Sequence, residues 1–134
     1  MILRYDGGKW SYDKPASVAA SSMNGIAMRQ DGGEGWAVGD YATILHFQNG
    51  AWREHDAYSG DWLRALCMTG DFTAGFAVGH RGEIVRFTNG KWEFSPERKR
   101  VSVTLNDVWL KADGSEGWAV GERGEIMRFS GPGE

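Results

Sequence analysis

The sequence predicts an all-β fold made of a unit of about 40 residues that occurs three times. The stretch "GWAVGERGEIMRF" at 117–129 has copies at 35–47 and 75–87. The chain has 20 glycines but only 3 prolines, which is typical of strands joined by many tight turns. Seven Trp, six Phe and four Tyr favour short, half-buried strands. At 134 residues, we expect a single domain, 1–134.

The three copies align without gaps, so equivalent residues can be placed in columns. The aromatic that opens the motif recurs after 40 residues, from Trp36 to Phe76, and again after 42, at Trp118. The other columns are Gly39/Gly79/Gly121, Ile44/Ile84/Ile126 and, upstream, Met23/Leu63/Leu105.

Each unit divides into four short runs separated by turns. The first run is followed by a turn rich in Gly and Asp, which tolerate positive φ, and the fourth follows an Asn-Gly turn, a strong hairpin signal. We expect strands at 23–28, 36–39, 44–47 and 51–54, at 63–68, 76–79, 84–87 and 91–94, and at 105–110, 118–121 and 126–129.

A period near 40 residues with four strands in each unit is typical of propeller blades. The second and third strands carry apolar residues at successive positions, which indicates that both sheet faces are covered. We therefore predict a β-propeller of four-stranded antiparallel blades. Blade 1 is 23–54, blade 2 is 63–94, and blade 3, 105–129, lacks its fourth strand.

The N-terminal residues 1–12 read as the missing end of a blade. "ILRY" at 2–5 matches the third strand and "KWSY" at 9–12 matches the fourth. Three blades are fewer than the four to eight of known propellers. We therefore expect a homodimer that forms one six-bladed ring, in which each N-terminal strand completes the partner's third blade. Residues 2–5 and 126–129 then compete for one position, and a fragment of a longer propeller is the alternative.

The motif "GWAVGERGEIMRF", with "LNDVWL" before it and "DGGKW" elsewhere, resembles the repeats of the BNR-like and Ycf48-like propellers. The resemblance covers nearly the whole chain and implies the fold more than an activity, because such repeats occur in assembly factors, in sialidase-like enzymes and in uncharacterised bacterial proteins. Asp6 lies four residues before Trp10, whereas the sialidase Asp box places its Asp five residues before the aromatic. The resemblance therefore does not carry sialidase chemistry to this chain.

Composition narrows the classes of partner. The net charge of −3 gives no overall attraction to nucleic acid or to anionic lipid. No apolar run approaches a membrane span, and the first residues lack the pattern of a signal peptide. Cys67 is the only cysteine, so no disulfide can form within the chain. We expect a soluble protein without nucleic-acid or membrane partners, in a compartment that the sequence does not identify.

The usual signatures of catalysis and metal binding are missing from the sequence. His46, His55 and His80 are too scattered for a zinc site, and no Ser, His and acid form a nucleophile motif. We expect no catalytic residue, no metal, no cofactor and no enzyme activity.

Arg4, Arg86 and Arg128 share a column with His46 and could be interpreted as an arginine set that grips a carboxylate. Equivalent residues lie in separate blades, however, so we expect them to stack on aromatics or to pair across blades instead.

Binding is expected on the face where the turns between the second and third strands meet the connections between blades, because loops on a rigid scaffold carry function. We predict a protein or peptide ligand, with a glycan as the alternative and a degenerate sialidase-like glycosidase as a weaker one. Trp62 either stacks on a sugar ring or packs under its own loop, and the basic run at 97–100 either meets an acidic partner or is a solvated loop. The predicted binding residues are Asp40, Tyr41, Asp56, Tyr58, Trp62, His80, Arg81, Arg98, Arg100, Glu122 and Arg123.

Overall fold

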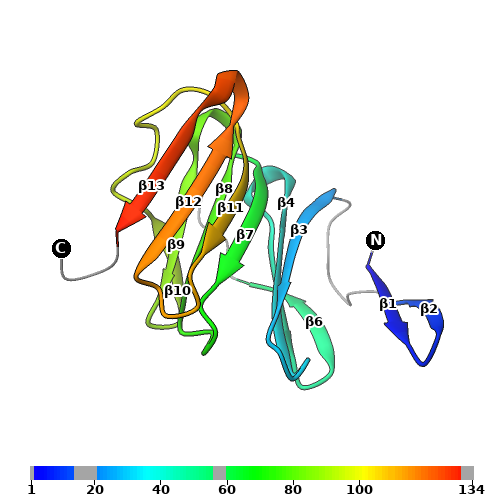
Figure 1. The fold of residues 1–134 in the computed structure, drawn as a ribbon. Helices are drawn as coiled ribbons and strands as arrows, with labels where there is room; N and C mark the ends of the chain where they lie inside the picture. The colour runs from blue at the N-terminus through cyan, green and yellow to red at the C-terminus, as the bar shows by residue number, and fades with distance from the viewer. Residues whose placement is uncertain (1, 14–20, 56–59, 131–134) are drawn as a thin grey trace.

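The computed structural model describes residues 2–13, 21–55 and 60–130, and in these ranges the regular elements are strands and one-turn 3-10 segments (Figure 1). The all-β prediction is therefore confirmed. All strand pairs are antiparallel, and they form four sheets. These are β1(Leu3–Asp6) and β2(Lys9–Tyr12); β3(Met23–Met28), β4(Glu34–Gly39), β5(Ile44–Gln48) and β6(Ala51–Glu54); β7(Leu63–Met68), β8(Ala74–Gly79), β9(Ile84–Thr88) and β10(Lys91–Phe94); and β11(Leu105–Leu110), β12(Glu116–Gly121) and β13(Ile126–Ser130).

The strands lie within two residues of the predicted positions, because local turn chemistry sets their ends; the second strand of each unit begins two residues earlier than predicted. In the β5–β6 hairpin, Asn49 and Gly50 have φ of 54° and 79°, and in the β9–β10 hairpin Asn89 and Gly90 have 51° and 78°. Two successive residues with positive φ match the twist of the flanking strands, and Asn-Gly adopts this turn most readily. Each unit is thus a meander with neighbouring strands in sequence order.

The three larger sheets stack face to face, with β7 beside both β3 and β11 (Figure 1). Because strand side chains alternate between the two faces, each sheet supplies residues to two cores. Trp36, Val38 and Ile44 join Leu66 and other residues of sheet β7–β10 in one cluster. The opposite face of β8 and β9 forms a second cluster with sheet β11–β13.

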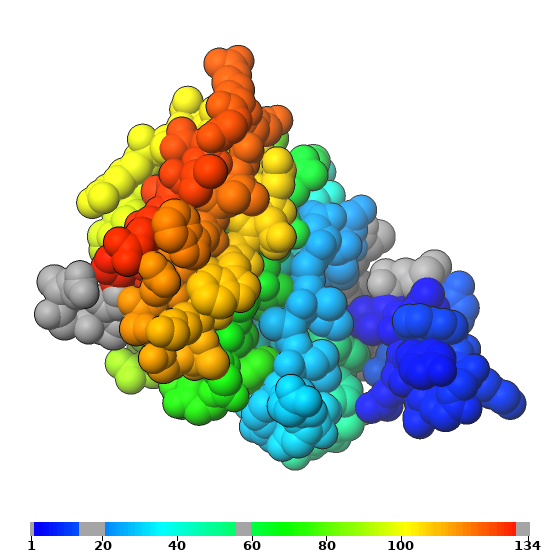
Figure 2. All heavy atoms as spheres, viewed as in Figure 1, coloured from blue at the N-terminus to red at the C-terminus, as the bar shows by residue number. Residues whose placement is uncertain are grey.

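The β1–β2 hairpin lies outside this stack, against the sheet β3–β6 of its own chain (Figures 1 and 2). Ile2 packs on the cluster that contains Leu45, Phe47 and Trp52, and the Arg4 guanidinium lies 5.6 Å from the Phe47 ring centroid. The hairpin thus covers the outer strands of this sheet. The predicted pairing of the N-terminal strand with a partner's third blade involves a second chain and stays a prediction.

The repeated glycine at the end of the second strand has a steric reason. A Cβ on Gly39, Gly79 or Gly121 would lie only 2.1, 2.0 or 2.4 Å from the carbonyl oxygen of Ser22, Trp62 or Thr104, respectively. The backbone before each first strand therefore passes directly over this glycine. This close approach brings the connections between units onto the turns that carry the candidate site.

None of the helical segments in the described part of the chain is long and apolar enough to cross a membrane.

Candidate functional site

Three equivalent turns line one end of the sheet stack. They are the 3-10 segments η1(Asp40–Ala42), η2(His80–Gly82) and η3(Glu122–Gly124). The middle residues Tyr41, Arg81 and Arg123 have φ of 56°, 52° and 59°, a left-handed conformation that costs a non-glycine residue roughly 1 kcal/mol or more. The turn geometry therefore places a large side chain at each tip.

Aromatic rings form a row between the first two of these turns. The Tyr41 and Trp62 ring centroids are 5.1 Å apart with planes at 61°, and those of Trp62 and His80 are 6.1 Å apart. Tyr41 is 71% exposed and Trp62 41%. The His80 amide donates to the Trp62 carbonyl at 2.8 Å, and His80 Nδ1 lies 3.4 Å from Thr104 Oγ1. We call Tyr41, Trp62 and His80 the aromatic row.

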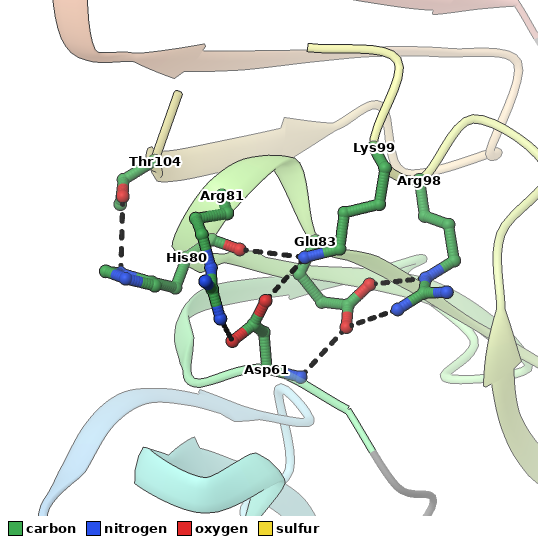
Figure 3. A network of polar contacts seen from close by, with 7 residues as sticks. All are labelled: Asp61, His80, Arg81, Glu83, Arg98, Lys99 and Thr104. Atoms are coloured by element: carbon green, nitrogen blue, oxygen red, sulfur yellow. Dashed lines mark hydrogen bonds and ion pairs between the residues drawn. The ribbon is translucent and has the colours of Figure 1, made fainter. Parts of the chain in front are cut away.

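A charged group borders this row (Figure 3). The Asp61 carboxylate accepts a hydrogen bond from Lys99 Nζ at 2.5 Å and one from Arg81 Nη2 at 3.2 Å. The Lys99 hydrogen bond is the main cause that lowers the pKa of Asp61, although partial burial opposes it. Asp61 is therefore ionised at neutral pH and holds two cations beside the exposed rings.

Beneath this surface, Glu83 anchors the loops. Its side chain is fully buried, and it accepts from Arg98 Nε at 2.6 Å, Arg98 Nη2 at 2.9 Å and the Asp61 amide at 2.9 Å (Figure 3). Burial raises the pKa of Glu83, but the hydrogen bonds from Arg98 and Asp61 outweigh it, so the pKa is lowered. The Arg98 guanidinium also lies 3.7 Å from the Phe94 ring centroid. Glu83 thus joins a turn, a connection and the loop at 95–104.

The structure brings four of the predicted binding residues together: Tyr41, Trp62, His80 and Arg81. Asp40 accepts from Asn24 Nδ2 at 2.9 Å, and Glu122 accepts from the Thr104 amide at 3.1 Å, so both brace their turns. Arg123 lies at the third tip.

Of the remaining predicted residues, Arg98 belongs to the buried layer of this site, and Arg100 lies elsewhere. Arg98 binds the buried Glu83, and Arg100 lines a cavity between β8, β9 and the sheet β11–β13. Asp56 and Tyr58 lie outside the described residues.

Sequence reasoning missed Glu83, Lys99 and Thr104 as parts of this site, whereas Asp61 was expected only as an acceptor for sugar hydroxyl groups beside Trp62. Lys99 lies within the basic run that the sequence did single out. The sequence gives only a weak indication that Glu83 is special. The equivalent residues are Thr43 in the first unit and Glu125 in the third, so an acid at this position is not confined to the second unit.

The arrangement offers exposed rings beside paired charges, so it can hold both apolar and charged groups of a ligand. Trp62 is 41% exposed, so its own loop does not bury it and part of its surface is open to a ligand. Within residues 2–13, 21–55 and 60–130, no group of three or more His, Cys, Asp or Glu side chains is placed to hold a metal ion.

The predicted stacking of the arginine column is observed: the guanidinium of Arg86 lies near Phe76 and Phe129, and that of Arg128 near Trp118.

No family model and no curated protein matches this chain. Among solved structures, it is similar to a putative 6-phosphogluconolactonase from Bacteroides uniformis, with a TM-score of 0.62 and 15% sequence identity. The match covers 94% of this chain and 43% of that one, so the chain spans less than half of the length of its structural neighbour. At this identity, the likeness shows a shared fold.

The prediction that the chain is not an enzyme rests on the lack of a catalytic motif, and this likeness contradicts it. A protein described as an enzyme is built on the same fold, so the fold does not mark this chain as non-catalytic. The likeness assigns no catalytic residue here.

Proposed function

We propose that this chain is a binding unit that recognises a protein or peptide at the aromatic row. The observation that carries the proposal is the exposed Tyr41–Trp62 pair beside the Asp61 carboxylate with its two cations. Tyr, Trp and Arg are the residues that most often dominate protein interfaces. A peptide supplies both an apolar side chain for the rings and charged groups for Arg81 and Lys99.

A glycan is the second candidate, favoured by the partly exposed Trp62 ring next to a carboxylate. Sugars bind with the apolar face of the ring on an aromatic and with hydroxyl groups on acidic oxygens. The Tyr41 and Trp62 planes meet at 61°, which forms an angled wall instead of a flat platform. This angle favours an inserted side chain over a stacked sugar.

We also propose that the three larger sheets are propeller blades that continue into a second chain. Trp36 and Val38 on the first sheet, and Phe76 and Val78 on the second, are buried against the next sheet. The equivalent face of β11–β13 exposes Trp118, Val120 and Ile126, at 40%, 43% and 62%. Exposed apolar faces of this kind mark interaction sites. A homodimer with one six-bladed ring is the assembly we expect.

The hairpin adds a condition to this assembly. We infer that β1 takes the place of the third strand of a preceding blade, because Ile2 just before it packs on the cluster of Leu45, Phe47 and Trp52. β13 is the third strand of its own sheet. In a six-bladed ring, both would occupy one position in the joining blade. One of the two strands must therefore leave its place when two chains meet.

The binding proposal is tested with the purified chain on a display library of random dodecapeptides and on a glycan array. We expect peptide hits whose affinity falls at least tenfold in Trp62→Ala, consistent with an interface hot spot. Tyr12→Ala is the matched control, because Tyr12 is 71% exposed like Tyr41 but lies on the hairpin. Glycan hits lost in Trp62→Ala would replace the peptide by a sugar, and hits unaffected by Trp62→Ala and Tyr41→Ala would overturn the site.

Turnover is measured separately, by incubating the chain with the enriched ligands, with chromogenic glycosides and with a phosphorylated sugar lactone. Product formed by wild type but not by Asp61→Asn would mean that the same face also catalyses a reaction.

A further inference from the structure

One position in the second unit lacks an acid that the other two units pair with a side chain on their third strand. In the first unit, Glu34 at the start of β4 lies 2.7 Å from His46 on β5. In the third, Glu116 at the start of β12 lies 2.8 Å from Arg128 on β13. The second unit has Ala74 at this position, although Arg86 stands on β9 where the other units have His46 and Arg128.

The Arg86 guanidinium has no acidic partner among the described residues. It lies beside the contacting rings of Phe76 and Phe129, 5.9 Å from the first centroid and 5.8 Å from the second, and its side chain is half-buried. Other arginines without an ion pair to a described residue, such as Arg53 and Arg123, are exposed. The missing partner leaves guanidinium hydrogen-bond donors of Arg86 free of any acidic side chain in the described part of the chain, and a ligand carboxylate can accept from them.

There is space for such an anion beside Arg86. A cavity of about 240 Å³ opens between the β7–β8 turn and the β11–β12 turn, and its lining includes Thr69, Thr73, Ala74, Arg86 and Phe129. Ala74 contributes only a methyl group where the other units place a carboxylate. The cavity lies at the end of β8 opposite to His80, so it is separate from the aromatic row.

We propose that Arg86 binds the carboxylate of a ligand in this cavity, in the place that Glu34 and Glu116 fill in the other units. A guanidinium and a carboxylate form two parallel hydrogen bonds, which makes this pair stronger than a single contact. Arg86 lines the cavity together with Phe129, so a ligand in the cavity can reach the guanidinium. The expected ligand is therefore a small carboxylic acid or an acidic side chain.

Two aspartates in the cavity lining favour a ligand with one negative charge over a ligand with two. Asp71 and Asp113 also line the cavity. Asp71 Oδ1 accepts from the hydroxyl groups of Thr69 and Thr73, and Asp113 Oδ1 accepts from Ser115, so both carboxylates are bonded within their own turns. Their charges still oppose an anion, and they oppose a phosphate dianion about twice as strongly as a carboxylate.

The test is an NMR titration of the arginine side-chain Nε–H signals with sodium acetate, against sodium chloride at equal ionic strength. We expect the Arg86 signal to shift with saturation in acetate and only slightly in chloride. Ala74→Glu should supply the carboxylate within the chain, abolish the acetate response and raise the unfolding midpoint. The control Arg53→Gln removes an exposed charge and should leave the acetate response unchanged.

Each result decides the proposal. No saturable shift in wild type would overturn it, as would an acetate response that persists in Ala74→Glu. A parallel titration with inorganic phosphate should give a weaker response, and saturation by phosphate but not acetate would overturn the assignment to a carboxylate. Arg86→Gln identifies the signal and should show no response. None of these readouts depends on Trp62, so they are independent of the peptide-binding proposal.

Discussion

The sheet β7–β10 and the sheet β11–β13 carry the same motif but lie in different surroundings. Val78 is 1% exposed, and its equivalent Val120 is 43% exposed. The same difference occurs at the other end of the stack, where Ile26 is 58% exposed while its equivalent Leu66 is buried. Burial in this fold therefore depends on whether the next sheet is present, and not on the motif itself.

The faces between sheets are stable within one chain, whereas the faces at the two ends of the stack would be stabilised only by association. The interior face is packed whatever the concentration, whereas the end faces gain stability only if something covers them. Substitutions at equivalent positions should thus differ widely in dilute solution.

The largest difference is expected for a charge placed on the two equivalent valines. Val78→Asp buries an unpaired carboxylate and should lower the free energy of unfolding by about 4 kcal/mol. Val120→Asp stays in water and should cost less than about 0.5 kcal/mol. Urea unfolding of both variants at micromolar concentration measures this. Equal losses would show that the outer face is covered in dilute solution.

A second difference concerns the column of Glu83 and Glu125. Glu83→Gln removes the charge that holds Arg98 and should cost about 2 kcal/mol, below the range for fully buried pairs because Arg98 retains solvent contact. Glu125→Gln, at a partly exposed position, should cost less than about 0.5 kcal/mol. Urea unfolding at pH 7 gives both values, and a Glu83→Gln cost as small as that of Glu125→Gln would contradict the anchoring role.

Glu83 also predicts a pH dependence. Its pKa in the folded chain lies below the ordinary value of 4.5, so the unfolded chain binds the proton more readily. The stability that this group contributes is present above about pH 4.5 and is lost as the pH falls through the folded pKa. Unfolding midpoints below pH 5 should therefore fall more steeply in wild type than in Glu83→Gln, and parallel curves would argue against it.

Association should depend on the end face more than on the turns. By light scattering across a dilution series, we expect wild type to approach twice the chain mass of 14.8 kDa. Ile126→Arg should weaken this association at least tenfold, because it places a charge on an apolar interface. Tyr41→Arg, an equally drastic change on the aromatic row, should leave the mass unchanged. A wild type that stays at 14.8 kDa at high concentration would remove the support for the six-bladed dimer.

The strand positions could be predicted because they depend on local signals that recur along the chain. Examples are the Asn-Gly turns and the glycine that ends the second strand of each unit, such as Gly79. The exposure of Trp118 could not be predicted in this way, since Trp36 occupies the same motif and is buried. It depends on a neighbour that the motif does not encode.

The candidate site was predictable only in part. Tyr41 and Arg81 come from equivalent turns, so the repeat places them on one face. Glu83 receives its partner Arg98 from the loop at 95–104, whose sequence is not repeated in the connections before the first two units, and no periodicity indicates that path. Likewise, the unpaired state of Arg86 follows from a missing acid at Ala74 and emerges only when the pairs of all three units are compared.

The smallest difference in the free energy of unfolding is expected between Glu34 and Glu116, the two acids that pair with a side chain on the third strand of their units. The Glu34–His46 pair is about four-fifths buried and also involves Arg29, whereas Arg128 in the Glu116–Arg128 pair is 56% exposed. Exposed ion pairs contribute little, so Glu116→Ala should cost less than about 0.5 kcal/mol, and Glu34→Ala about 1 kcal/mol. Thermal unfolding at low protein concentration measures both. If Glu116→Ala costs as much as Glu34→Ala, solvent does not screen the outer face, and something other than water covers it.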